Sequence, residues 1–276
     1  MNYAQAFAQY EAVLAANGVE KAALTYVFND WKDWSRLDFI LHQSHEIPEA
    51  DLRQLDRITK LLKQHIPAQY ITKKAYFADL TLTVDERVLI PRPETEELVN
   101  LILEENPDES LTVLDIGTGS GAIAIALAKT RKNWQISASD ISKKALLLAQ
   151  DNARANQTAV NFLHSDVFSQ ISDKYDIIVS NPPYIAFEDR NEVGQNVLLH
   201  EPHLALFADN EGLSVYQKIA EGAAEHLTAG GRIYLEIGYK QGASVSEIFR
   251  NYFSDKRIRL LQDSFGKDRM VVIDDG

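Results

Sequence analysis

From residue 111 onward the sequence alternates between short apolar runs and segments with helical periodicity, which limits the folds open to the chain. The apolar runs have the length of strands, and most are separated by segments long enough to cross back over a sheet. We expect strands at 111–115, 135–140, 160–165, 175–180, 232–237, 258–263 and 269–274, and helices at 121–131, 142–155, 211–227 and 241–252. This order predicts an α/β domain whose mostly parallel sheet is covered by helices on both faces, with an antiparallel last strand allowed.

The first 74 residues lack this alternation and carry only helical patterns. Apolar side chains recur at three- and four-residue steps in 2–16, and similar stripes follow as far as Pro67. A short helix around Ser35–His42 is expected to bury three side chains: Leu37, Ile40 and Leu41. Residues 1–74 are therefore predicted to form a small helical bundle without chemistry of its own. Attached to an enzyme, such a bundle usually binds a partner.

Residues 75–92 have a different pattern and are expected to link the two domains. Side chains alternate from Phe77 to Val84, and a second apolar run at 88–90 follows, which predicts a β-hairpin. A rigid, proline-containing joint comes next, and a helix then runs to about Glu105. We place the domain boundary at this hairpin, with the α/β domain spanning 93–276.

Charge is unevenly distributed along the chain. The whole chain has 40 acidic and 28 basic residues, a net charge of −12, whereas residues 1–75 hold nine of each kind. All of the net negative charge therefore lies in 76–276, a difference that is consistent with two domains. An acidic chain is also a poor candidate for a protein held on nucleic acid by bulk electrostatics.

The chain contains no cysteine, which excludes disulfides and thiolate metal sites and favours a cytoplasmic protein. The N-terminus lacks a charged region followed by an apolar run, so no secretory signal is expected. No apolar stretch approaches the ~20 residues of a membrane span. Two histidine pairs, His42 with His45 and His200 with His203, have no nearby ligands to complete a set, so no metal site is expected.

A glycine-rich loop follows the first strand of the alternating region. After Asp115 and Ile116 it consists of Gly117, Thr118, Gly119, Ser120 and Gly121. The glycines allow the backbone to turn sharply and to approach a ligand closely, and the next helix begins here with free N–H groups. A dinucleotide site would read G-x-G-x-x-G, which this loop does not match, so the loop alone is weak evidence.

Acidic residues end three successive strands, which packing alone does not explain. Beyond Asp115, the second strand ends at Asp140, at the distance where an acid accepts the hydrogens of a ribose. The third ends at Asp166, which could accept from an adenine amino group while Val167 or Phe168 packs on the adenine face. Negative charge here disfavours pyrophosphate and suits a cationic ligand that carries adenosine. S-adenosyl-L-methionine has both properties.

A proline-rich turn, Asn181-Pro182-Pro183-Tyr184, follows the strand at 175–180. The prolines fix φ and remove two backbone donors, which makes the turn stiff and leaves its carbonyls free to accept. The Asn181 side-chain oxygen and the Pro182 carbonyl could then each accept a hydrogen bond from one N–H of a planar –NH2 group. Tyr184 could stack on that group or could pack the loop against the sheet. An isolated turn of this kind usually only ends a strand, but the acidic strand ends upstream favour a substrate clamp.

Together these segments resemble the class I S-adenosylmethionine-dependent methyltransferases, whose fold is a Rossmann-like, mostly parallel seven-stranded sheet. The Asn-Pro-Pro-Tyr turn looks like the signature of enzymes that methylate a planar amino nitrogen. The segment from Pro67 to Glu96, the pair Glu201-Pro202, and the stretch 230–238 are similar to the PrmC/HemK family. Lys73 departs from that family, since a glycine is expected there.

The resemblance implies methylation of the side-chain amide nitrogen (N5) of the glutamine in the Gly-Gly-Gln motif of bacterial peptide chain release factors. The implied catalytic residues are Asn181, Pro182 and Tyr184, with Pro183 beside them in the substrate site. The implied S-adenosyl-L-methionine residues are Asp115, Gly117, Thr118, Gly119, Ser120, Gly121, Asp140, Asp166, Val167, Phe168 and Asn181. The bundle at 1–74 would help to hold the release factor, and stable binding to nucleic acid or membranes is not expected.

Two alternatives remain open. An enzyme that methylates an amino group of adenine or guanine in DNA or RNA would use the same clamp, but it should show a basic groove. The loop at 184–210 has one basic residue, Arg190, against five acidic ones, which disfavours phosphate. A cofactor-binding scaffold without turnover is the other alternative, and the intact Asn181 and Asp115 argue against it.

Overall fold

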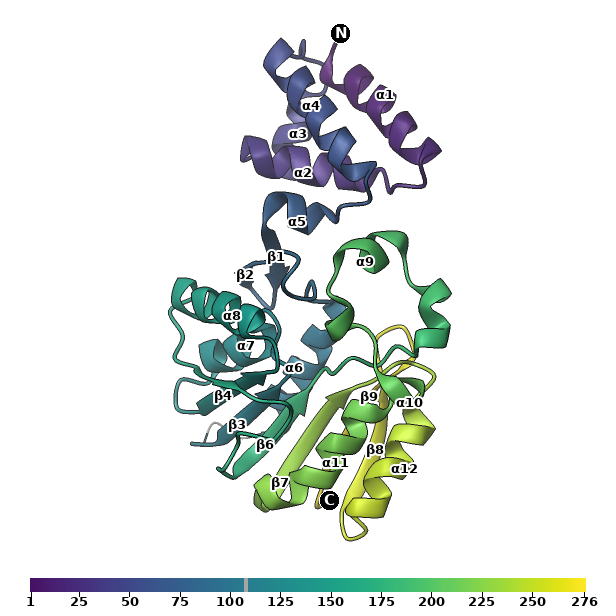
Figure 1. Ribbon diagram of the computed structural model, residues 1–276. Coiled ribbons are helices and arrows are strands. Elements are labelled where there is room, and N and C mark those ends of the chain that lie inside the picture. Colours follow the sequence, from purple (N-terminus) through teal and green to yellow (C-terminus); the bar gives the residue numbers. More distant parts are fainter. Residues whose placement is uncertain (107–108) are drawn as a thin grey trace. The chain divides into compact units, whose positions relative to one another are not determined.

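The computed structural model describes residues 1–106 and 109–276. Within it the chain forms two compact units (Figure 1). The first consists of residues 1–74 and 193–200, and the second consists of residues 75–192 and 201–276. Each unit has its own hydrophobic core.

The first unit is helical, as the sequence predicts. Its helices are α1 (Tyr3–Ala16), α2 (Ala22–Lys32), α3 (Arg36–His42), α4 (Glu49–Leu62), α5 (Ala68–Thr72) and α9 (Gln195–His200). α1 begins with a capping box, in which Asn2 and Gln5 each accept a backbone N–H of the other. Buried side chains of α1, α2 and α4 form the core: Phe7, Leu14, Leu24, Phe28, Leu55 and Ile58.

The expectation that α3 buries Leu37, Ile40 and Leu41 is wrong. Their side chains are 63%, 52% and 60% exposed. α3 packs instead through Phe39, whose ring lies 4.7 Å from that of Phe7. A seven-residue helix has too few turns for its apolar pattern to define which side faces inward, so the tertiary contacts decide.

The second unit is built on a seven-stranded sheet with the strand order β5-β4-β3-β6-β7-β9-β8. The strands are β3 (Thr112–Ile116), β4 (Gln135–Asp140), β5 (Asn161–His164), β6 (Tyr175–Ser180), β7 (Leu227–Glu236), β8 (Arg257–Gln262) and β9 (Asp268–Asp274). Only β9 runs against its neighbours, pairing antiparallel with both β7 and β8. The predicted mostly parallel sheet with an antiparallel last strand is confirmed.

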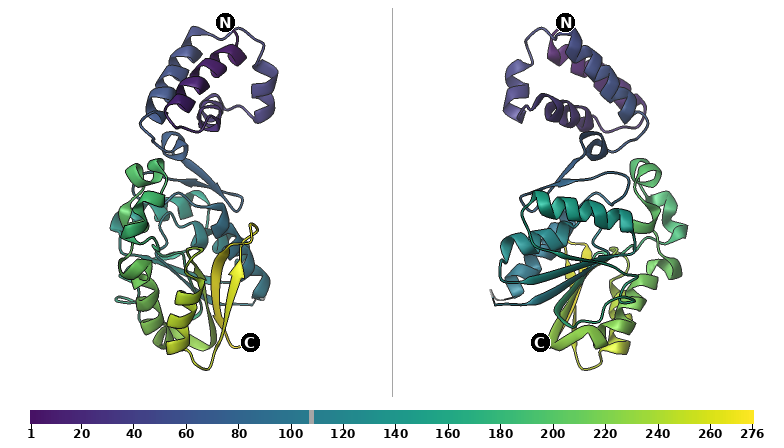
Figure 2. Two further views of the ribbon diagram at one scale, coloured as in Figure 1. Left: turned by 90° about the vertical axis from the view of Figure 1, so that its right-hand side faces the viewer. Right: turned by 60° about the vertical axis from the view of Figure 1, so that its left-hand side comes forward.

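Helices cover both faces of this sheet (Figure 2). One face packs against α6 (Pro93–Glu105), α7 (Ala122–Thr130) and α8 (Lys143–Ala155), and the other against α11 (Ser214–His226) and α12 (Gly242–Tyr252). Successive residues of β3 point to opposite faces, with Val113 in the first core and Leu114 in the second. Because both faces are covered, the carboxyl ends of the parallel strands form the edge at which a ligand can bind.

The hairpin at the start of this unit differs from the prediction. Its strands are β1 (Lys74–Phe77) and β2 (Leu80–Thr83), joined by Ala78 and Asp79, which both adopt positive φ (44° and 61°). Asp79 is a common residue in such turns, but Ala78 is not and no glycine follows, which explains why the sequence places the turn too late. The run 88–90 forms no strand, because the Ile90 N–H donates to the Glu201 carboxylate instead (3.1 Å).

The long loop after β6 contains only short helical turns. These are η1 (Phe187–Glu192), η2 (His203–Ala205) and α10 (Asp209–Gly212) in the second unit, with α9 belonging to the first. In the parts of the chain that the structure describes, no helix is long and apolar enough to cross a membrane.

Candidate active site

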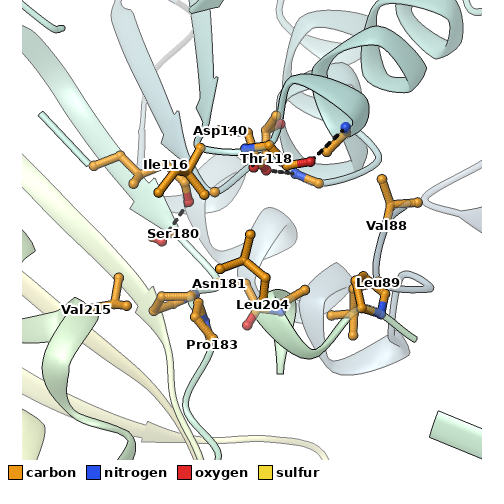
Figure 3. Close-up of a pocket in the computed structure, with 18 of the residues that line it drawn as sticks. Val88, Leu89, Ile116, Thr118, Asp140, Ser180, Asn181, Pro183, Leu204 and Val215 are labelled. Carbon is orange, nitrogen blue, oxygen red and sulfur yellow. Dashed lines mark hydrogen bonds between the residues drawn. The ribbon is translucent and has the colours of Figure 1, made fainter. Parts of the chain in front are cut away.

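A cavity of about 540 Å³ lies at the carboxyl edge of the sheet, and we call it the Asn181 pocket. It is lined by residues of the second unit only. Ten of the residues expected from the sequence line it: Gly117, Thr118, Gly119, Ser120, Asp140, Asp166, Val167, Asn181, Pro182 and Pro183. Figure 3 shows Thr118 and Asp140 on one side, with Asn181 and Pro183 facing them. The structure therefore brings the two expected half-sites into one cavity.

The glycine-rich loop leaves β3 in a left-handed conformation. Gly117 and Gly119 have φ of 72° and 56°, and an added Cβ on either would meet nothing within 4 Å. Glycine is favoured at both positions because the loop needs positive φ there, and not because a side chain would clash. The space next to both residues is open to a ligand. Gly121 does not line the pocket; a Cβ there would come within 2.8 Å of Ile125, so this glycine allows the loop to pack on α7.

Asp140 is held between the loop and the start of α8. Its carboxylate accepts from the backbone N–H of Gly119 (2.9 Å) and of Ser142 (2.8 Å). Burial raises its pKa, and these backbone bonds counteract that rise. Each oxygen keeps a second acceptor position, so Asp140 can still receive two hydroxyl groups of a ligand.

Asp115 lies beneath the loop and does not line the pocket. One of its oxygens accepts from the Thr118 hydroxyl (2.6 Å). Burial raises the pKa of Asp115 to about 7. From this position Asp115 holds the Thr118 hydroxyl through their hydrogen bond and does not itself face the cavity.

Of the three residues expected at the third strand end, Asp166 and Val167 line the pocket and Phe168 does not. Val167 lines the pocket and adopts a positive φ of 50°, an uncommon conformation for a β-branched residue. Phe168 does not line it; its ring stacks on His226, with centroids 4.3 Å apart. Asp166 forms an exposed ion pair with Lys218 (3.0 Å), a pocket residue that sequence reasoning missed.

Asn181 follows directly on β6, whose last residue, Ser180, donates to the carbonyl of Ile116 (2.7 Å). This bond connects the ends of β6 and β3 and places Asn181 next to the glycine-rich loop. Tyr184 lies outside the pocket lining. It packs beside Gly238 and the second core, and its carbonyl accepts from Gln241 (2.9 Å). The structure thus gives Tyr184 the packing position that the sequence left open.

Two buried residues next to Asn181 were missed. The Asn181 side-chain nitrogen donates to the Thr95 hydroxyl (3.1 Å), which donates to the Glu236 carboxylate (2.6 Å). Burial raises the pKa of Glu236 to about 7. Glu236 ends β7, and the same signal that identified Asp140, an acid at the end of a parallel strand, could have identified it.

An ion pair between a half-buried arginine and a buried glutamate connects two further walls of the pocket. Glu201, with a fully buried side chain, accepts from Arg92 (2.7 Å) and from the backbone of Ile90 (3.1 Å). Arg92 lines the pocket from the segment before α6, and Pro202 to Ala205 line it from the loop after β6. Glu201 therefore holds together two walls that lie more than 100 residues apart in the sequence.

Comparisons with known proteins agree with this architecture. A family model described as a methyltransferase small domain matches residues 95–265, and one described as a PrmC N-terminal domain matches residues 5–72. A solved methyltransferase from Pyrococcus furiosus is 19% identical with a TM-score of 0.55, covering 80% of this chain and 98% of that one. The 16S rRNA N2 G1207 methyltransferase of T. thermophilus, solved with AdoMet and guanosine, is 20% identical with a TM-score of 0.52, covering 74% and 50%. At these identities the likeness shows the fold.

The curated relatives are far more similar. A release factor glutamine methyltransferase from Streptococcus pneumoniae is 54% identical, covering 100% of this chain and 99% of the relative. The protein of the same name from Lactococcus lactis is 53% identical over 94% and 96% of the two chains. One from Enterococcus faecalis is 40% identical over 99% and 96%. Given this identity over nearly the whole length of both units, the chain belongs to the release factor glutamine methyltransferase family.

Proposed function

We propose that this protein transfers a methyl group from S-adenosyl-L-methionine to the side-chain amide nitrogen of the glutamine in the Gly-Gly-Gln motif of bacterial peptide chain release factors. One observation supports it most directly. The Asn181 clamp and the acidic half-site of Asp140 face each other across a single cavity, so a cofactor and an amide can meet there. The near full-length relatives carry the name of this activity.

The lining of the Asn181 pocket fits the cofactor. Asp140 offers free acceptor positions for ribose hydroxyls, and Gly117 and Gly119 leave open space beside it. Val167 offers an apolar surface for an adenine, and the carboxylate of Asp166, a second lining residue, could accept from the adenine amino group. Acidic groups at this edge also suit a positively charged ligand.

The chemistry asks mainly for alignment, because an amide nitrogen has a delocalised lone pair and is a poor nucleophile. When bound, S-adenosyl-L-methionine supplies a methyl group on a positively charged sulfur, which departs with the S–C electron pair as the N–C bond forms. The Asn181 oxygen and the Pro182 carbonyl each accept a hydrogen bond from one N–H of the glutamine amide. These two bonds fix the orientation of the amide plane. The same acceptors stabilise the positive charge that develops on the nitrogen. That nitrogen then becomes acidic and loses one proton to water, so no general base is required.

We infer that residues 1–74 of the first unit hold the release factor and that residues 75–92 serve as the linker. This division of labour is supported by the neutral charge of the helical segment and by the absence of catalytic motifs in its sequence. The match of residues 5–72 to the PrmC N-terminal domain is consistent with it.

The experiment that tests the proposal is transfer of labelled methyl from S-adenosyl-L-methionine to a purified release factor. Three samples run beside it: the factor with its loop glutamine replaced by alanine, total nucleic acid, and the Asn181→Ala enzyme. We expect label only on the intact factor with the unaltered enzyme. Label on nucleic acid instead would refute the substrate assignment while leaving the clamp in place. Binding of the cofactor without any transfer would identify a scaffold.

A further inference from the structure

A chain of hydrogen bonds leads from the Asn181 side chain through Thr95, which also lines the Asn181 pocket, to Glu236, which does not. Nδ2 of Asn181 donates to Oγ1 of Thr95 at 3.1 Å, and Oγ1 of Thr95 donates to Oε2 of Glu236 at 2.6 Å. Thr95 lies in the first turn of α6, and Glu236 is the last residue of β7. Thr95 and Glu236 are 4% and 2% exposed, so water does not compete for these bonds. Three segments far apart in the sequence thus meet behind the catalytic side chain.

The chemistry of each group fixes the direction of this chain. An ionised carboxylate only accepts hydrogen bonds, so the Thr95 hydroxyl has to donate to Glu236. The hydroxyl oxygen can then accept, and Asn181 must offer it an N–H. The amide nitrogen of Asn181 is in this way directed toward Thr95, and its oxygen remains for the pocket that Asn181 lines.

We propose that Thr95 and Glu236 are positioning residues that hold the Asn181 amide in the one orientation able to accept a hydrogen bond from the substrate. The inference rests on the proposed function, since the substrate group is taken to be a glutamine –NH2. If the Asn181 amide turned over, its own –NH2 would face that of the substrate, and two donors cannot bond to each other. An asparagine without such support could adopt either orientation.

The relay should depend on the ionisation of Glu236. The titratable and charged groups that face it are Glu94, Tyr184, Tyr216 and Arg269. Burial raises the pKa of Glu236 to about 7; the hydrogen bond from Thr95, the positive charge of Arg269 and a hydrogen bond from the Asn181 side chain oppose that rise. The ionised carboxylate thus also attracts the Asn181 amide nitrogen directly, which favours the same orientation. Burial also raises the pKa values of both tyrosines, so they stay neutral. A protonated Glu236 can donate to Thr95, which frees the Thr95 proton for the Asn181 oxygen and permits the wrong orientation.

Four variants test the relay. Glu236→Gln and Thr95→Val keep the shape of each side chain, but the hydrogen bonds no longer fix the orientation of the Asn181 amide. We therefore expect kcat to fall about tenfold, the usual effect of one lost hydrogen bond. Thr95→Ser retains the hydroxyl and should restore most of kcat. Tyr216→Phe is the matched control, because it removes a buried hydrogen bond to the backbone oxygen of Glu236 (2.8 Å) and leaves the relay intact. In all four, the Kd for S-adenosyl-L-methionine and the KM for the release factor should change little.

The pH profile separates positioning from mere structural support. For the unaltered enzyme, kcat should rise with pH through about 7, and this rise should be absent in Glu236→Gln. An unchanged kcat in Thr95→Val would overturn the proposal. So would a Thr95→Ser variant as slow as Thr95→Val, or a pH profile identical in Glu236→Gln and the unaltered enzyme.

A measurement on the enzyme alone separates this inference from the proposed function. With selective 15N-asparagine labelling, the side-chain –NH2 signals of Asn181 are those lost in Asn181→Ala. They should move with pH through about 7 in the unaltered enzyme and stay fixed in Glu236→Gln. Signals that do not respond would overturn the relay even if the enzyme is active. Responding signals in an enzyme that does not methylate release factors would uphold the relay and refute the proposed substrate.

Discussion

Replacing Glu236 with glutamine should change how the stability of the second unit depends on pH. Burial raises the pKa of this glutamate from 4.5 to about 7. Because the folded state binds the proton more tightly than the unfolded state, stability is greatest below pH 4.5 and declines as the pH rises through about 7. At 1.36 kcal/mol per pH unit, the complete decline is about 3 kcal/mol. About 2 kcal/mol of it falls between pH 5.5 and 8.5.

The assay is guanidinium unfolding of both proteins at pH 5.5 and pH 8.5, followed by tryptophan fluorescence. Trp134 is buried in the second unit, whereas Trp31 and Trp34 lie in the first. Replacing Trp31 and Trp34 by phenylalanine in both proteins therefore leaves a signal from the relevant unit alone. Relative to its parent, Glu236→Gln should become more stable by about 2 kcal/mol on going from pH 5.5 to 8.5.

The matched control is Glu104→Gln in α6. Glu104 is exposed, and its replacement also removes one negative charge from the second unit. A stability difference between Glu236→Gln and its parent that is the same at the two pH values would refute the reasoning. In that event Glu236 would titrate alike in the folded and unfolded states, and its burial would carry no energetic cost.

Three further predictions concern the site. Asn181→Ala should lower kcat by about 100-fold or more, as at other preorganised hydrogen bonds, while equilibrium dialysis shows cofactor binding retained; an unchanged kcat would contradict the clamp. Gly121→Ala should lower stability by about 1–3 kcal/mol, because its Cβ would meet Ile125 at 2.8 Å and its φ is 84°; an unchanged melting temperature would show that α7 shifts freely. Phe168→Leu should lose about 1 kcal/mol of stacking on His226 without changing the cofactor Kd, and a weakened Kd would place Phe168 at the ligand after all.

The sheet could be predicted because its signal is local. Strands buried on both faces read as apolar runs, and the helices between them show their own period, so neither depends on distant contacts. The exposed face of α3 shows where this fails. Leu37 has the right spacing for a buried position, but a short helix is oriented by what packs on it, and here Phe39 makes the inward contact.

The site was predictable in part for a related reason. Gly117, Asp140 and Asn181 each follow a strand, and parallel strands bring such residues to one edge. Thr95 and Glu236 are 141 residues apart, and only the packing of α6 against the end of β7 reveals that they are bonded. Tyr184 and Phe168 carry aromatic rings suited to a ligand, yet the direction of each ring is set by core contacts that no spacing encodes.

The buried carboxylate of Glu201 also bears on how the family can vary in length. The chain leaves the second unit at residue 193 and returns to it at Glu201, where the bonds to Arg92 and Ile90 hold the point of return. The other end of this excursion, Glu192, ends the short helical turn η1 and forms an exposed ion pair with Lys240. Insertions and deletions within 193–200 should therefore be tolerated without displacing the residues that follow Glu201 in the pocket wall, and length variation among relatives should concentrate before Glu201 and not after it.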